Sequence, residues 1–181
     1  MFVMTATRPG GRSARVRDVV HRAATELLLE GSDAAIPKIA ERAGVNPTSV
    51  YRRWGSRENL LLDAAVTRLR EQSPMPDTGS LRGDLLAWAA GVERAMTEPD
   101  GQLLLRALVA TMPAKARPAE HLRARGADLQ VMLDTAAARG ESTPTVDDLL
   151  DHVLAPIYLR ALFGIPLEPG IGTTLVDRLL D

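Results

Sequence analysis

The sequence predicts an all-α fold in two domains, for three reasons. Only 3% of the 181 residues are aromatic, whereas alanine and leucine are abundant, a composition typical of helices packed on helices. Apolar residues recur at intervals of three and four along most of the chain, which is the spacing of one helix face. Prolines and glycines interrupt this pattern where helices are expected to end, so we expect about nine helices.

The first expected helix begins after Ser13, which can serve as its N-cap, and runs as far as Gly31. Its apolar face is broad. This face consists of Val16, Val19, Val20, Ala23, Ala24, Leu27 and Leu28.

Two short helices are expected next, in residues 36–43 and 47–54. Gly44 ends the first of them, because glycine adopts the left-handed conformation that terminates many helices. Asn46 is a good N-cap for the second, and Pro47 fits its first position. This pair is expected to form a helix-turn-helix. The first helix packs across both of them, and the three helices together make a domain over residues 1–60.

The second short helix has an outward face that suits DNA. Val50 and Trp54 are four residues apart and anchor it to the core, which leaves hydroxyl and guanidinium groups outside. Hydroxyls reach phosphates or bases, and guanidinium groups pair with guanine or phosphate. The expected DNA contacts are Thr48, Ser49, Tyr51, Arg52 and Arg53, with Lys38 and Arg57 as phosphate partners. An ordinary solvated helix face is the alternative.

Positive charge gathers in the same part of the chain. Residues 1–60 contain ten Lys or Arg and six Asp or Glu, whereas residues 61–181 contain twelve and seventeen. In residues 1–12, Arg8 and Arg12 stand among glycine and proline, a composition typical of a disordered tail. The alternative is an arm whose arginines contact phosphates or a minor groove.

The run IAERAGVNPTSVYRRWGSRENLLLDA resembles the DNA-binding region of the TetR family of transcriptional regulators. The matching residues are Ile39, Ala40, Ala43, Gly44, Val45, Tyr51, Trp54, Ser56, Arg57, Glu58 and Leu60. The family often has a threonine near the start of its second helix, and the hydroxyl of that threonine can contact a DNA phosphate. This chain has Ala35, Ile36 and Pro37 there, and Lys38 is the residue that can supply the phosphate contact instead. The resemblance therefore implies a DNA-binding regulator, and repression is the family's usual mode.

A second domain is expected over residues 61–181. Ser56 caps a fourth helix over residues 57–72, and a fifth follows over residues 80–97. A sixth helix begins at Pro99, and a seventh ends near Gly140. Thr143 is the expected cap of the next helix, which Pro156 should kink. A last short helix follows a linker at residues 166–172.

The last two expected helices are apolar over more than one face. In the TetR family these helices of each subunit form a four-helix dimer interface, so the resemblance implies a homodimer that reads a palindromic site. A terminal pair buried in its own core is the alternative. The expected interface residues are Leu150, Val153, Leu154, Ile157, Leu175, Val176 and Leu179.

The resemblance also implies a regulatory pocket among the fourth to eighth helices. A small-molecule effector bound there would favour a state that no longer fits DNA. For each candidate lining residue, a plain core position is the alternative. The candidates are Trp88, Met96, Met112, Met132, His152, Tyr158 and Phe163.

Enzyme chemistry finds little support. Cysteine is absent, and G-x-S-x-G, phosphate-loop and H-E-x-x-H motifs are missing. Asp148, Asp151 and His152 lie on neighbouring turns where a metal or proton relay is conceivable, but a solvated face is favoured, and we expect no metal or cofactor. A transmembrane stretch and a signal peptide are also missing, which favours a cytoplasmic protein.

Two other functions remain open at this point. The helix-turn-helix could be a scaffold in a helical small-molecule-binding protein or enzyme that no longer binds DNA. The chain could also be an architectural DNA binder without an effector.

Overall fold

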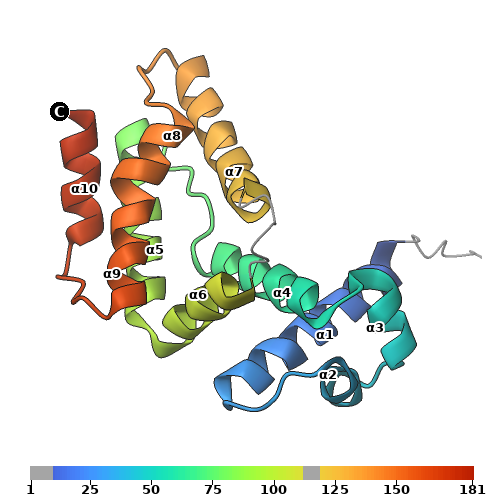
Figure 1. Cartoon of the computed structure of the whole chain (residues 1–181). Helices are drawn as coiled ribbons and strands as arrows, with labels where there is room; N and C mark the ends of the chain where they lie inside the picture. Colours follow the sequence, from blue (N-terminus) through green and yellow to red (C-terminus); the bar gives the residue numbers. More distant parts are fainter. Residues whose placement is uncertain (1–9, 112–118) are drawn as a thin grey trace, which may run out of the picture. The chain divides into compact units, whose positions relative to one another are not determined.

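The structure, a computed structural model, describes residues 10–111 and 119–181. In these residues it consists of helices and contains no strand, which confirms the predicted all-α class (Figure 1). The chain forms two compact units, Met1–Ala64 and Ala65–Asp181. Most of the expected N-terminal arm lies outside the described residues.

The first unit contains α1 (Gly10–Leu29), α2 (Ile36–Ala43), α3 (Pro47–Trp54) and the start of α4 (Arg57–Gln72). The helix α1 begins before Ser13, so the expectation that Ser13 is its N-cap was wrong. Ser13 instead lies in the first turns, where its carbonyl and hydroxyl oxygens accept hydrogen bonds from Arg53 at 3.0 and 3.1 Å.

The turn between α2 and α3 has the predicted caps. Gly44 has a φ of 64°, in the left-handed region, and its N–H donates to the carbonyls of Ala40 and Glu41. The Asn46 side chain accepts a hydrogen bond from the Thr48 N–H at 2.8 Å. These local bonds set where α2 ends and α3 begins.

All four helices contribute to the core of the first unit. Trp54 is 8% exposed and Val50 1%, as expected for core residues, while Val45 is partly buried against them. Leu60, Leu61 and Ala64 of α4 belong to the same core. The first unit therefore extends past residue 60, where the sequence placed the domain boundary, because this turn of α4 packs inside it.

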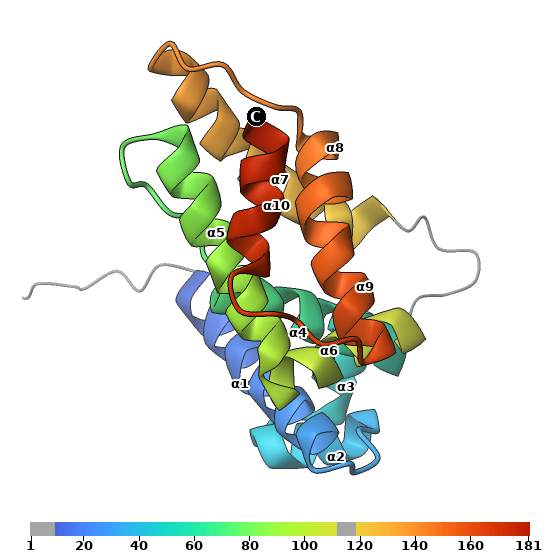
Figure 2. The ribbon, with the colours of Figure 1, turned by 90° about the vertical axis from the view of Figure 1, so that its left-hand side faces the viewer.

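The second unit holds the remainder of α4 and a bundle of further helices. They are α5 (Leu81–Thr97), α6 (Pro99–Thr111), α7 (Ala119–Ala138), α8 (Val146–Leu149), a π turn (Leu150–Leu154), α9 (Ala155–Phe163) and α10 (Ile171–Leu180). The helices α5, α9 and α10 lie alongside one another (Figures 1 and 2). Trp88 of α5 is fully buried in this bundle.

The segment from α8 to α9 differs from the expectation in two ways. The N-cap is Thr145 and not Thr143. The Thr145 hydroxyl accepts a hydrogen bond from the Asp148 N–H, and the Asp148 carboxylate accepts one from the Thr145 N–H, which together form a capping box. The irregularity expected at Pro156 takes the form of the π turn just before it, in which the Ala155 N–H donates to the Leu150 carbonyl. A proline ring clashes with the carbonyl four residues earlier, and the wider turn relieves this clash.

The start of α10 is fastened to α5. The Glu93 carboxylate accepts hydrogen bonds from the N–H groups of Gly170 and Gly172 at 2.8 and 2.9 Å. A Cβ at Gly172 would lie 2.9 Å from the carbonyl carbon and oxygen of Ala89. The two helices can approach this closely only because residue 172 has no side chain.

Replacing Gly172 by alanine is therefore expected to lower the free energy of unfolding by about 1–3 kcal/mol, because the new methyl group meets backbone atoms that cannot move aside. Urea denaturation followed by circular dichroism measures this. Gly126→Ala is the matched control, since its Cβ would meet only a Val146 methyl at 3.4 Å. We expect it to leave stability unchanged or raise it by about 0.5–1 kcal/mol. Equal losses in both variants would contradict the close approach.

Candidate functional site

The helix α3 presents a polar face to solvent. Val50 and Trp54 point into the core, whereas Thr48 and Arg52 are exposed and Tyr51 is 49% exposed. Ser49 is half-buried. The outward side of α3 therefore offers hydroxyl groups and a guanidinium group to a ligand outside the protein.

Arg53 also lies on α3, but its guanidinium group is already engaged. It donates both hydrogen bonds to Ser13 and lies over the ring of Trp54, 5.2 Å from the centroid. Arg53 thus joins α3 to the beginning of α1. This contact links residues 40 positions apart and was not predicted.

Of the two predicted phosphate partners, one is engaged within the protein and the other is not. Arg57 donates from Nε to the Ala34 carbonyl at 3.1 Å and lies 4.0 Å from a carboxylate oxygen of Asp33. Lys38, on α2, is exposed and pairs with none of the described residues. Lys38 and Arg52 are therefore the predicted cations whose charged groups remain available.

A polar cluster beneath α3 holds this face in place. The Asp63 carboxylate accepts hydrogen bonds from the indole N–H of Trp54 at 2.8 Å and from Arg17 at 3.1 Å, and lies 2.9 Å from His21 Nε2. Partial burial alone would raise the pKa of Asp63, but the hydrogen bonds from His21 and Trp54 and the charge of Arg17 outweigh it and lower that pKa to about 2. The cluster ties α1, α3 and α4 together, and the sequence analysis did not identify it.

The predicted pocket residues of the second unit do not surround one cavity. Trp88, Met96 and Met132 are at most 4% exposed and belong to the core. Phe163 is 75% exposed at the end of α9. Met112 lies outside the described residues. Met96 and Met132 each also line a separate hollow, of about 240 and 310 Å³ respectively.

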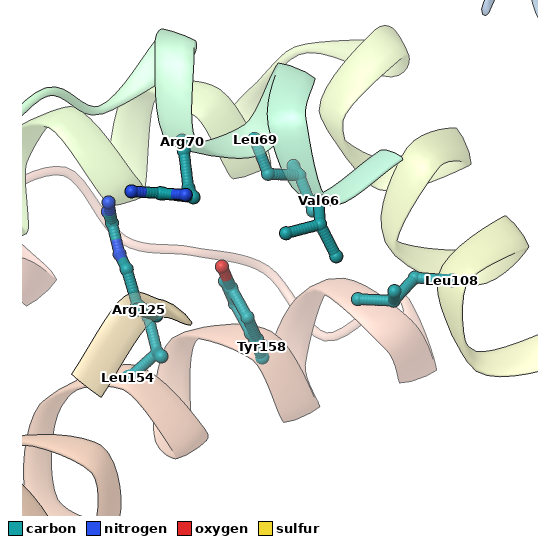
Figure 3. A pocket seen from close by; sticks show the side chains of 7 residues that line it. All are labelled: Val66, Leu69, Arg70, Leu108, Arg125, Leu154 and Tyr158. Carbon is teal, nitrogen blue, oxygen red and sulfur yellow. The ribbon is translucent and has the colours of Figure 1, made fainter. Parts of the chain in front are cut away.

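Tyr158 lines a mostly apolar hollow in the second unit (Figure 3). The cavity volume is about 30 Å³. Five helical segments contribute to it, from α4, α6, α7, the π turn and α9. The lining residues are Val66, Leu69, Arg70, Leu108, Arg125, Leu154 and Tyr158.

Arg125 in this hollow was missed by the sequence analysis. It is 6% exposed, donates from one guanidinium nitrogen to the Ser73 carbonyl at 3.0 Å and from the other to the Ser73 hydroxyl, and lies over the Trp88 ring at 5.7 Å. Burial lowers its pKa, although an arginine remains charged in proteins. Its position four residues before the buried Leu129 is the signal that could have found it, because that spacing puts both on one helix face.

The predicted interface residues divide into two groups. The first group is buried inside the second unit and consists of Val153, Leu154, Ile157 and Val176. The other three are Leu150, Leu175 and Leu179, which are partly exposed. A groove of about 340 Å³ runs between the π turn and α10. It is lined by Asp151, His152, Pro156, Leu175, Arg178 and Leu179.

The described part of the chain contains no group of three or more side chains that could together hold a metal ion, and the Asp148 carboxylate is part of the cap of α8. Among the helices described, none is both long enough and apolar enough to span a bilayer.

Comparison with known proteins agrees with both units. The family described as bacterial regulatory proteins, tetR family, matches residues 19–64, and the tetracyclin repressor-like C-terminal domain matches residues 75–179. The HTH-type transcriptional regulator AqdR of Rhodococcus erythropolis is 32% identical over 174 residues, which cover 93% of this chain and 81% of that protein. A protein of Mycobacteroides abscessus named DNA-binding transcriptional repressor TetR is 30% identical over 165 residues, 85% of each chain.

A solved structure shares the fold over nearly its whole length. The crystal structure of the TetR family transcription regulator SCO0332 is 30% identical and covers 92% of this chain and 97% of its own, with a TM-score of 0.77. Sequence and fold thus agree from the polar face of α3 to the end of α10, and the chain belongs to the TetR family of helix-turn-helix transcriptional regulators.

Proposed function

We propose that this regulator is a cytoplasmic repressor, which binds a palindromic operator as a homodimer and is released by a small-molecule effector. In this proposal the first unit binds DNA and the second unit dimerises and holds the effector. The observation that carries the proposal is the face of α3, where Thr48, Tyr51 and Arg52 are exposed above a buried Trp54. The relative from M. abscessus, whose name states repression, supports the direction of control.

The uncommitted side chains divide between two roles. Arg52 is free of partners among the described residues and can pair bidentately with a guanine in the major groove. Lys38, on the neighbouring helix, is placed for a phosphate, which adds affinity but no sequence preference. A homodimer would bring two such faces to half-sites about one turn of DNA apart, or about 34 Å.

Replacing Arg52 by alanine is expected to weaken binding to the selected operator by about 10- to 100-fold and to relax the preference at one base pair of each half-site. Selection from a random duplex library at two salt concentrations, followed by titration of the enriched sequence, measures both effects. Arg94→Ala, an exposed arginine of the second unit, is the matched control and should change neither. If no sequence is enriched, the helix-turn-helix is only a scaffold.

The groove beside α10 supports the homodimer. Leu175 and Leu179 line it and remain partly exposed, although α10 is otherwise packed on α5. A second copy of the same surface would cover these side chains on both subunits at once, as two-fold symmetry requires. The charged Asp151 and Arg178 at the groove suit the edge of such an interface.

A further inference from the structure

The guanidinium group of Arg125 is a buried positive charge that forms no ion pair with a carboxylate among the described residues, although the nearby charge of Asp128 favours its charged form. Its contacts are the carbonyl and hydroxyl of Ser73 and the ring of Trp88. The neighbouring Arg70 differs, because Asp128 accepts two hydrogen bonds from it at 2.7 and 2.6 Å. A guanidinium has five N–H donors, and Ser73 occupies only two of those of Arg125.

Tyr158 contributes a second unused donor to the same hollow. Its side chain points from α9 towards α4, with the hydroxyl between Val66 and the guanidinium groups of Arg70 and Arg125 (Figure 3). None of the described residues is hydrogen-bonded to this hydroxyl. Burial raises the pKa of Tyr158, so the hydroxyl keeps its proton and can donate it.

We propose that this hollow binds a small organic acid in its carboxylate form, an inference that rests on the effector-regulated function proposed above. The carboxylate would accept hydrogen bonds from Arg125 and Tyr158 and neutralise the buried charge. An apolar body of the ligand would lie against Leu69, Leu108 and Leu154. A neutral or cationic ligand would leave Arg125 without a hydrogen-bonded counter-ion.

The small size of the cavity links binding to a change in the protein. A volume of about 30 Å³ holds little more than a water molecule, so an organic acid must displace lining side chains. Val66, Leu69 and Arg70 all lie on α4, whose first turns supply Leu60 and Leu61 to the core of the first unit. The helix that supplies three lining residues thus also supplies core residues to the first unit.

The first experiment titrates the full chain, without DNA, in a calorimeter. The probes are octanoate and benzoate, each compared with its uncharged counterpart, 1-octanol or benzyl alcohol. We expect at least one acid to bind saturably and about 10-fold or more tightly than its alcohol. If both alcohols bind as tightly as the acids, or neither acid binds saturably up to about 10 mM, the proposal is overturned.

Variants then identify the residues that hold the carboxylate. Arg125→Gln can still donate to Ser73 but lacks the charge, and should weaken acid binding about 30-fold, while Tyr158→Phe should weaken it about 5-fold. Arg106→Gln, on the exposed side of α6, is the matched control and should bind normally.

The melting temperature of the unliganded protein separates ligand binding from a structural role. A buried charge without a counter-ion destabilises the fold, so Arg125→Gln should melt at the same or a higher temperature than the wild type. A clear loss of melting temperature together with unchanged acid binding would contradict the proposal. If that variant does not fold, Tyr158→Phe and the acid–alcohol comparison decide.

Operator binding is measured separately, by fluorescence anisotropy with and without octanoate or benzoate. Acid binding in a protein without sequence-specific DNA binding would support the carboxylate site and refute the proposed function. Sequence-specific DNA binding without any acid binding would refute the carboxylate site and leave the DNA-binding part of the proposed function supported. Release of DNA by the bound acid would support both.

Discussion

Trp54→Ala is expected to lower the free energy of unfolding of the first unit by about 3–5 kcal/mol. The indole is 8% exposed in the core shared by α1 to α4, and its N–H donates to Asp63 at 2.8 Å. The substitution removes the ring and one of the donors that hold the Asp63 carboxylate. Urea denaturation followed by far-UV circular dichroism measures the loss, and operator binding should disappear with it.

Trp54→Phe separates the two contributions. It keeps an aromatic ring in the core but cannot donate to Asp63, so we expect a loss of about 1–3 kcal/mol. Tyr51→Ala, on the exposed side of the same helix, is the control and should change stability by no more than about 0.5 kcal/mol. A cost of Trp54→Ala as small as that of Tyr51→Ala would show that Trp54 does not hold α3 in place.

Leu179→Glu is expected to convert the proposed homodimer to monomers, raising the dimer dissociation constant at least about 100-fold, or about 2.7 kcal/mol. The carboxylate would have to lose its water in the groove that a second copy covers, beside the carboxylate of Asp151, and burial of a charge in place of an apolar side chain is costly. Sedimentation equilibrium measures the association, and titration with the selected operator measures its consequence. A dimer binds both half-sites as one unit, so operator affinity should fall steeply as well.

Thr173→Glu is the matched control for this charge. It lies on the exposed side of α10 and does not line the groove. We expect it to remain dimeric. If both variants dissociate equally, the added negative charge on α10, and not the groove, causes the dissociation. A monomeric wild type would refute the homodimer.

Sequence reasoning succeeded where local interactions decide the structure. Gly44, Asn46 and Pro47 set the turn between α2 and α3 through contacts within a few residues, so their effect can be read from the order of residues. The same reasoning placed the cap of α8 at Thr143, whereas the structure has it at Thr145. The reciprocal bond with Asp148 decides between them, and it depends on backbone geometry that the sequence does not display.

Contacts between distant residues could not be predicted. Helical spacing identifies which side of a helix is buried, but not which other helix it meets. Arg53 therefore looked free for DNA, although Ser13 accepts its hydrogen bonds, and Asp63 was not linked to His21. The same limit applies to the hollow, where spacing puts Arg125 on a buried face without showing that Tyr158 lies opposite.

The π turn at Leu150–Leu154 is equivalent to one extra residue inserted into a helix without forming a loop. Each residue of an α-helix advances the chain by about 100° around the axis, so losing one residue here would rotate all of α9 by that angle. Tyr158 would then turn out of the hollow and another residue would replace it, while Arg125 stayed in place. Loss of a single residue from this helix would therefore change the lining of the hollow without any substitution of the charged residue.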